Sequence, residues 1–214
     1  MATRDPQATR DQILEAAFRA VYERGMAATS LDDVLAKAGV TKGALYHHFD
    51  GKQALGCALV DERLAPMVLA RWVEPIAGTD DPVSALQALL RSECTAAPAS
   101  DVVRYGCPLN NLAQEMASTD DELRRRLDAV VARWVAALRD ALARGQGAGT
   151  VRRDADPARV ARFVVASIEG AIGLAKTARD PAVLRSVHEE LATYLESLRP
   201  AADGKAKARG RRRP

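Results

Sequence analysis

The stretch "SLDDVLAKAGVTKGALYHHFDGKQAL", residues 30–55, predicts two short helices with a glycine turn between them. Ser30 is suited to cap the first helix, and Asp33, three residues later, completes a capping-box-like pair. Gly39 suits the left-handed residue that ends a helix, and Thr41 suits the cap of the next one. We therefore expect one helix to end just before the glycine and a second to follow directly after the turn.

The second of these helices is too short to be stable alone, so its neighbours must hold it in place. Leu45 and Phe49 lie four residues apart and supply an apolar anchor. The other positions crowd cationic, imidazole and aromatic groups together: Lys42, Tyr46, His47, His48 and Lys52. A core does not need such groups, so this face is expected to contact a partner.

Helical periodicity continues on both sides of this stretch. Residues 6–24 place apolar side chains at helical spacing between Asp5, which can cap, and Gly25, which can end the helix. A long helix should follow over residues 52–74, with a bend at Pro66. Further helices alternate with breakers rich in Gly, Pro and Asp, and no stretch alternates like a strand. The predicted fold class is all-α, with about nine helices.

Two short helices joined by a glycine turn and flanked by longer helices form the layout of a helix-turn-helix, here at about residues 31–50. In that layout the second helix enters the major groove of duplex DNA and its first turn meets the base edges. Lys42, Gly43 and Ala44 occupy this turn. Thr41, the free N–H groups of the helix start and the side chains that follow would hold phosphates.

The segment "TSLDDVLAKAGVTKGALYHHFDGKQAL", with "TRDQILEAAFRAVYERG" before it, resembles the DNA-binding motif of the TetR family of bacterial repressors. The resemblance covers residues 8–60. It implies a three-helix DNA-binding domain there, a ligand-binding and dimerisation domain over residues 61–199, and a homodimer that reads a palindromic operator. It places Lys42 to Ala44 on the bases. It places a second set on the DNA backbone: Thr29, Thr41, Tyr46, His47, His48 and Lys52.

Charge is unevenly distributed along the chain. The net charge is +3, but residues 200–214 hold six of the 31 Lys and Arg residues and one acid, Asp203, a net of +5, so residues 1–199 carry −2. This basic tail is nearly free of apolar residues and is expected to be disordered, with either a salt-sensitive attraction to DNA or no role. No stretch suits a membrane span or a signal peptide, and the three cysteines fit neither a disulfide framework nor a metal cluster. We expect a cytoplasmic protein without cofactor, metal or membrane partner.

The helices after residue 60 are expected to bind a small-molecule effector and a second copy of the chain. By the same resemblance, helices near 157–178 and 181–198 would pair with those of the partner, with Gly170 and Gly173 allowing close approach. Alternatively, both helices only cover their own domain. The pocket is expected to use apolar groups and amides, each of which also suits plain core packing: Trp72, Leu112, Met116, Trp134, Phe163, Asn110, Asn111 and Gln114.

Several alternatives stay open at this point. "YGCPL" places Cys107 near a helix N-terminus, which lowers the pKa of a thiol, so a redox-sensing or electrophile-sensing repressor is one alternative and an inert cysteine another. His47 and His48 point about 100° apart on a helix and have no third ligand nearby, which argues against metal. The sequence has three histidines and no phosphate loop, which argues against an enzyme. An architectural DNA-binding protein would not need the large second domain.

Overall fold

The computed structural model describes residues 5–201, and every regular element in this range is a helix, which confirms the predicted all-α class. Within the described residues the nine predicted helices are present if residues 52–76 are counted as one, and α7 adds a single turn. The elements in chain order are α1 (Pro6–Arg24), α2 (Leu31–Ala38), α3 (Lys42–His48), α4 (Lys52–Leu59), η1 (Val60–Leu64), α5 (Ala65–Val68), η2 (Leu69–Val73), η3 (Glu74–Ile76), α6 (Pro82–Ala96), η4 (Ala97–Ala99), α7 (Val102–Tyr105), α8 (Pro108–Met116), α9 (Asp121–Ala148), α10 (Pro157–Ala178) and α11 (Pro181–Glu196).

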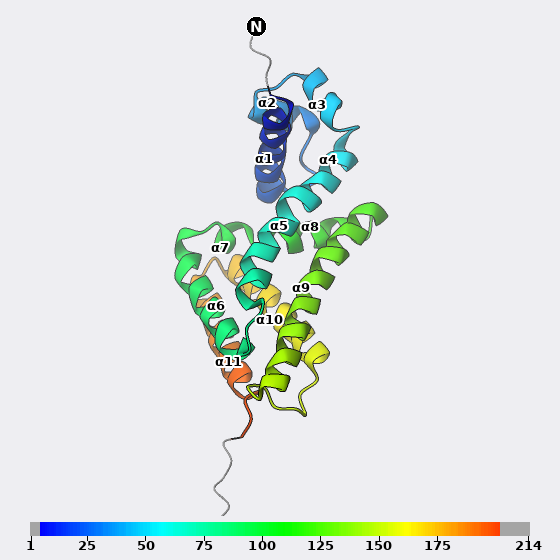
Figure 1. Cartoon of the computed structure of the whole chain (residues 1–214). Coiled ribbons are helices and arrows are strands. Elements are labelled where there is room, and N and C mark those ends of the chain that lie inside the picture. Colours follow the sequence, from blue (N-terminus) through cyan, green and yellow to red (C-terminus); the bar gives the residue numbers. More distant parts are fainter. Residues whose placement is uncertain (1–4, 202–214) are drawn as a thin grey trace, which may run out of the picture.

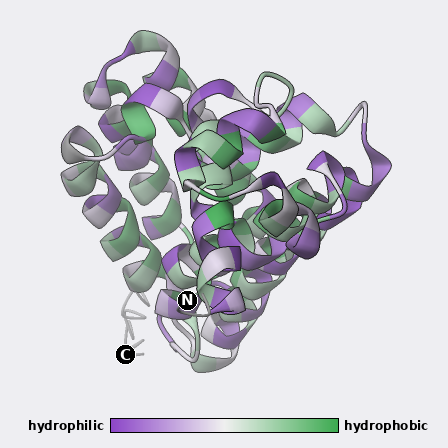
Figure 2. Cartoon of the chain, turned by 90° about the horizontal axis from the view of Figure 1, so that it is seen from above, coloured by the Kyte–Doolittle hydropathy of each residue, from purple (hydrophilic) through white to green (hydrophobic). Residues whose placement is uncertain are grey.

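The helices form two bodies joined along the molecule (Figure 1). The first three helices make one end, and the run from α4 to η3 leads from it into the larger body. There α10 packs against both α9 and α11, and α11 packs against α6. Hydrophobic and hydrophilic residues alternate around the helices, as Figure 2 shows from above. Each helix therefore has one face for the core and one for solvent.

The helix α1 contributes to two apolar clusters. Its middle packs into a small core with α2, α3 and α4: Ile13, Leu14, Ala16, Ala17, Val34, Ala38, Leu45, Phe49, Leu55 and Ala58. Further along α1, Phe18 and Val21 pack against the larger core of the second body. One rigid helix thus touches both bodies. A change in the larger core around Phe18 can reach the α2–α3 pair through it.

Pro66 lies where the helix of residues 52–76 departs from regular α geometry. The π-type turns η1 and η2 flank the short α5, which contains Pro66. Proline has no backbone N–H to donate and its ring crowds the preceding turn, so a regular hydrogen-bond ladder cannot pass through it. The wider π turns absorb this mismatch, and the helix continues.

The helix α9 is longer than its sequence indicates. The glycine-rich stretch that begins at Gly145 predicts a loop, but α9 continues to Ala148 and ends at Gly149, where φ is 78°. A Cβ at position 145 would lie 2.7 Å from Val151 and 2.9 Å from Pro82. Close packing therefore requires glycine there, and the contacts outweigh its low helix propensity. Residues 202–214, which hold nearly all of the predicted basic tail, lie outside the described residues.

Candidate functional site

Local capping bonds define where α2 and α3 begin and where α2 ends. Ser30 Oγ accepts the N–H of Asp33 at 3.1 Å, and the Asp33 carboxylate accepts the N–H of Ser30 at 3.0 Å, so the predicted capping box is present. Gly39 ends α2 with φ 64° and ψ 34°, a left-handed conformation that glycine adopts most readily. Thr41 caps α3 by accepting the N–H of Ala44 at 3.2 Å. The turn is held by its own residues.

The helix α3 presents an uncovered outer face. Leu45 and Phe49 bury its inner face against α1 and α2. On the outer face Tyr46 is 47% exposed, and the Nζ of Lys42 lies 5.9 Å from the centroid of its ring. A Cβ at Gly43 would meet no atom of residues 5–201 within 4 Å. Packing within the chain therefore does not require glycine there, and the space in front of the first turn is open to another molecule.

The C-terminal end of α3 is braced by α1. The guanidinium of Arg10 donates to the carbonyl of His48 at 3.2 Å and lies 4.4 Å from the centroid of the Phe49 ring. It also forms an ion pair with Glu62 in η1. The rings of His47 and His48 lie edge to face with their centroids 5.1 Å apart. The backbone at the end of α3 is thus held by a helix that connects to the larger body.

Thr29 requires a correction to the predicted DNA contacts. Its side chain is 3% exposed, and its hydroxyl donates to the carbonyl of Gly25 at 2.7 Å. This hydroxyl is therefore committed to the loop between α1 and α2 and is not presented to a phosphate. Lys52 differs, because its ammonium group makes only an exposed contact, to the carbonyl of Ala27 at 3.1 Å. Water or a phosphate can replace such a contact at small cost.

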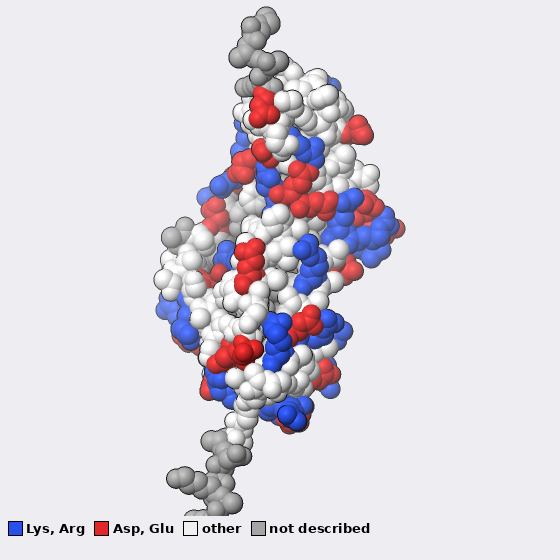
Figure 3. Space-filling view, viewed as in Figure 1, with Lys and Arg blue, Asp and Glu red and all other residues white. Residues whose placement is uncertain are grey.

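Charge is sparse on the α2–α3 end in the view of Figure 3. Most atoms there are white, and the blue and red ones are scattered. Lys42 and Lys52 place one ammonium group at the start of α3 and one at the start of α4. Such a surface favours a few positioned phosphate contacts over a broad basic patch.

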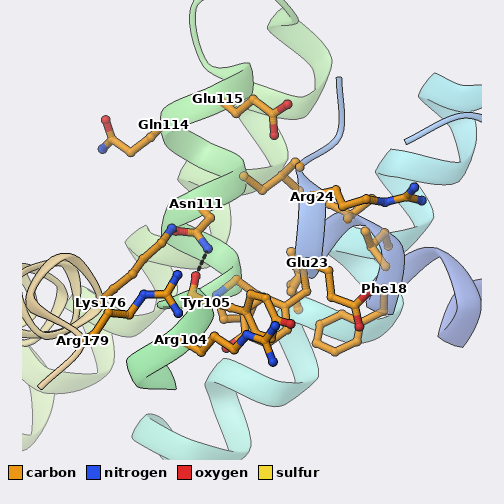
Figure 4. A pocket seen from close by; sticks show the side chains of 17 residues that line it. Phe18, Glu23, Arg24, Arg104, Tyr105, Asn111, Gln114, Glu115, Lys176 and Arg179 are labelled. Carbon is orange, nitrogen blue, oxygen red and sulfur yellow. Dashed lines mark hydrogen bonds between the residues drawn. The ribbon is translucent and has the colours of Figure 1, made fainter. Parts of the chain in front are cut away.

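Two adjoining cavities lie between the α1–α3 end and the larger body. The outer one has a volume of about 620 Å³ and takes its walls from α1, α7, α8 and the end of α10 (Figure 4). Arg104, Lys176 and Arg179 give it a cationic side. Asn111 is fixed in this wall, because it donates to the carbonyl of Tyr105 at 2.5 Å and accepts from Lys176 at 3.1 Å.

The inner cavity, of about 170 Å³, shares Phe18, Tyr22 and Pro108 with the outer one. Apolar and aromatic side chains make up most of its remaining wall. Glu169 of α10 also lies there, and its Oε2 atom has no hydrogen-bond partner among the described residues. Burial raises the pKa of this carboxyl to about 6. A hydrogen bond with the Cys107 thiol lowers this pKa, but burial outweighs it. The thiol carries no positive charge, so the carboxylate form of Glu169 remains costly in this largely apolar wall.

The predicted effector residues divide between cavity walls and core. Trp72 lines the inner cavity, and Trp134 stacks behind it with ring centroids 5.2 Å apart. Trp134 is only 1% exposed and belongs to the core, so its assignment to the pocket is corrected. Asn111, Leu112 and Gln114 line the outer cavity, and their contact with an effector stays a prediction.

Three other predicted effector residues lie elsewhere. Asn110 accepts a hydrogen bond from Gln114 at 3.4 Å on the surface of α8, and Met116 packs against the larger core. Phe163 is 50% exposed and packs edge-on against Tyr194, with ring centroids 4.8 Å apart. It lies outside the two cavities beside α1 and lines another cavity, of about 430 Å³, with Val160, Tyr194 and Leu198.

Cys107 does not have the activated thiol that its position predicts. It is the N-cap of α8, as expected, and it lies in the wall of the inner cavity. Burial raises the pKa of this thiol, and the neighbouring Glu169 carboxylate raises it further. These effects outweigh the N–H groups of Leu109 and Asn110, which lower the pKa. The expectation of a ready thiolate is therefore wrong, since the site stabilises the neutral thiol.

A carboxylate connects the larger body to the loop before α2. Glu115 of α8 accepts the N–H groups of Met26 at 2.8 Å and of Ala27 at 2.6 Å. The hydroxyl of Tyr22 donates to the carbonyl of Gly106 at 2.8 Å, which ties α1 to the segment before α8. The start of α8 therefore touches the cavities, and its end holds the loop that leads into the helix-turn-helix.

Four residues of these sites are not predicted from the sequence: Phe18, Tyr22, Glu115 and Glu169. Phe18 and Tyr22 read as ordinary apolar positions of α1. Glu169 carries one usable signal, since it is the only acid between Pro157 and Ala178. An isolated acid on an apolar helix has to find a partner, which marks it for a function. Glu115 carries no comparable signal.

Metal sites and membrane spans can be assessed over residues 5–201. There, no three His, Cys, Asp or Glu side chains come together in a way that could hold a metal ion. Nor does the same range contain a helix with the length and apolar character to cross a bilayer.

A helix-turn-helix with an open first turn, attached to a larger helical body with cavities, defines a DNA-binding transcriptional regulator. Comparison with family models agrees over both parts. "Bacterial regulatory proteins, tetR family" matches residues 13–58, and "Tetracyclin repressor-like, C-terminal domain" matches residues 82–191. The chain belongs to the TetR family of transcriptional regulators.

Relatives of the chain are regulators as well. The HTH-type transcriptional repressor DhaR of Mycobacterium sp. strain GP1 is 27% identical over 91% of this chain and 94% of its own. The HTH-type transcriptional regulator TtgR of Pseudomonas putida is 54% identical over 57 residues, 27% of each chain. The crystal structure of a TetR transcriptional regulator from Chloroflexus aurantiacus is 31% identical with a TM-score of 0.78, covering 90% of this chain and 96% of that one.

Proposed function

We propose that this regulator is a repressor that leaves its operator when a small molecule occupies the cavities next to α1. The main support for this proposal is that α1 contacts both the helix-turn-helix and the cavities of the larger body. Its middle, from Ile13 to Ala17, packs in the small core with α3, while Phe18 and Tyr22 further along line both cavities. A ligand that moves these two rings has a direct route to the reading helix. DhaR is described as a repressor, which agrees with this direction of control.

Duplex DNA would be held at the two ends of α3. Lys42, Gly43 and Ala44 in its first turn would meet base edges in the major groove. The phosphates would be held by the polar groups around this turn, without the buried Thr29: Thr41, Tyr46, His47, His48 and Lys52. The open space before Gly43 supports this orientation.

A homodimer would form through α10 and α11. Phe163 and Leu174 of α10 are 50% and 57% exposed, although both are large and apolar. Gly170 and Gly173 lie close by, and a Cβ at either would meet no atom within 4 Å. An apolar face with glycines on it fits a closely packed second copy. Two copies would set their α3 helices about one turn of duplex apart, roughly 34–36 Å, and so read a palindrome in the cytoplasm, where chromosomal DNA lies.

Coupling between ligand and DNA would pass through α1 and α8. The hydrogen bonds of Tyr22 to Gly106 and of Glu115 to Met26 and Ala27 tie the cavity walls to the loop before α2. A ligand that shifts α8 relative to α1 would change the spacing of the two reading helices in the dimer. The required coupling is modest, since about 1–3 kcal/mol changes DNA affinity roughly 5–150-fold.

The test is a gel-shift titration of the full chain on the intergenic DNA upstream of its own gene, with scrambled DNA of equal length as control. The proposal expects saturable binding of one dimer to a palindrome in that DNA, and sedimentation at the dimer mass without DNA. Binding that does not distinguish the two DNAs at moderate salt contradicts a specific repressor. A monomer in solution contradicts the α10–α11 interface.

A further inference from the structure

The inner cavity combines side chains that are suited to bind an amine. Its wall places the aromatic residues Phe18, Tyr22 and Trp72 around the same space as Glu169. Electron-rich ring faces attract cations, and the attraction grows when the site is shielded from water. A carboxylate beside three aromatic rings therefore combines the two groups that best stabilise a protonated amine.

Glu169 is the one acid of this wall without a partner for its charge among the described residues. Asp101, the other acid there, pairs with Arg19 at 3.6 Å. Arg71, the basic residue of the wall, pairs with Glu93. Asp101 and Arg71 are thus neutralised by partners that do not line the cavity. The Oε2 atom of Glu169 is buried and accepts no hydrogen bond within residues 5–201.

The remaining wall restricts what can reach Glu169. Met67, Val68 and Ile172 present apolar groups, and the volume of about 170 Å³ admits only a small molecule. The cavity adjoins the larger outer one, with Phe18 and Tyr22 between them. The outer cavity carries Arg104, Lys176 and Arg179 but also the acids Glu23 and Glu115. Glu23 pairs with Lys37, and Glu115 accepts two backbone N–H groups, so the Oε2 atom of Glu169 is the acceptor left over for a cation among the described residues.

We infer that the inner cavity binds a small molecule with an apolar body and one protonated amine, whose ammonium group donates to Oε2 of Glu169. This inference rests on the proposed ligand response and gives the ligand its chemical class. The body of the ligand would lie against Phe18, Tyr22 and Trp72, so binding would act directly on α1. A buried water on Glu169 is the competing occupant, and it requires no ligand.

Three probes of similar shape distinguish an amine site from a cavity that holds only water: benzylamine, benzyl alcohol and benzoate. The two tryptophans of the chain are Trp72 and Trp134, and both lie at or behind this wall, so their fluorescence reports occupancy of the full-length protein. We expect a saturable change with benzylamine, and affinity lower by about 10–100-fold for benzyl alcohol and benzoate, as loss of a hydrogen bond between charged groups predicts.

Variants of the wall test whether benzylamine binds within the inner cavity. Glu169→Gln is expected to weaken benzylamine by about 10–100-fold while it leaves benzyl alcohol nearly unchanged. Glu190→Gln, at an exposed acid of α11, is the matched control and should bind benzylamine like the natural chain. Met67→Phe keeps Glu169 but fills the cavity, so it should lose benzylamine as well. Thermal unfolding of each variant establishes that it is folded.

The inference is overturned if no probe binds, if benzoate binds as tightly as benzylamine, or if Glu169→Gln binds benzylamine unchanged. Gel shifts of the natural chain separate this failure from failure of the proposed function. Specific DNA binding without benzylamine binding rejects the amine site and keeps the repressor. Absence of specific DNA binding rejects the repressor, whatever the probes show.

Discussion

The turn between α2 and α3 takes its capping bonds from residues 30–44, whereas the inner cavity takes its wall from four segments spread over residues 18–172. The first region is a surface and the second a cavity between helices. A surface needs only a correctly shaped backbone behind it, and local caps can supply that shape. A cavity exists only when distant helices fail to fill the space between them. The two regions should therefore respond differently to mutation.

The largest expected loss of stability comes from replacing a core leucine in either body, and it also tests whether the two regions respond separately. Leu45 and Leu138 are both 0% exposed, and replacing either with alanine should lower the free energy of unfolding by about 2–5 kcal/mol. Urea denaturation measures this loss. Gel shifts then distinguish the two variants, since Leu45→Ala removes the anchor of α3 and should abolish specific DNA binding in the folded protein. Leu138→Ala leaves that anchor intact, and loss of DNA binding in folded Leu138→Ala would contradict the separation.

The link between the regions is tested at Glu115. Glu115→Gln removes a charged acceptor from the N–H groups of Met26 and Ala27, which should cost about 1.5–3 kcal/mol of stability. Hydrogen exchange at these two amides should become faster. Gln114→Ala is the neighbouring control at an exposed position and should leave both amides protected. Unchanged exchange in Glu115→Gln would show that the carboxylate does not hold the loop.

Burial of Glu169 should appear as a pH dependence of stability. Its pKa is raised to about 6, so the folded chain keeps this proton between about pH 4.5 and pH 6 while the unfolded chain loses it. Stability contributed by the protonated form is present below about pH 4.5 and is lost as pH rises through 6, by on the order of 2 kcal/mol. Glu169→Gln should lack this loss, so unfolding free energies of the two chains should diverge as pH rises. A constant difference from pH 4.5 to pH 7 would contradict the burial of this carboxyl.

The smallest of these effects concerns the local caps. Ser30→Ala removes the side-chain oxygen that accepts the N–H of Asp33, which should cost about 1 kcal/mol. Ser186→Ala, within α11, loses only an exposed bond to the carbonyl of Val183 and should change stability by less than about 0.5 kcal/mol. Thermal unfolding compares the two. Equal effects would mean that the capping box does not contribute to holding α2.

The same contrast explains what the sequence could and could not predict. Ser30, Gly39 and Thr41 act on neighbours within a few residues, so their roles are visible in the order of residues. The all-α class follows from helical periodicity between clear breakers. Gly145 is different, because it continues α9 only through contact with Val151 and Pro82.

Site residues were hardest to predict where burial decides their role. Thr29 carries a hydroxyl suited to phosphate, but the fold turns it inward to Gly25. Cys107 stands at a helix start, yet burial and Glu169 reverse the expected effect on its pKa. Phe163 has the residue type of a pocket wall but lies half-exposed and outside the cavities beside α1. In each case the local signal is real, and packing from a distant segment outweighs it.

The central claim is that α3 lies in the groove of a duplex and is held at both ends by its polar side chains. The direct test is the salt dependence of operator affinity for the natural chain and for a variant with Lys42→Gln, Lys52→Gln and Tyr46→Phe. The account predicts weaker binding and a slope of log affinity against log salt that is smaller by about 2, one for each lysine. Equal affinity and equal slope at moderate salt would contradict it.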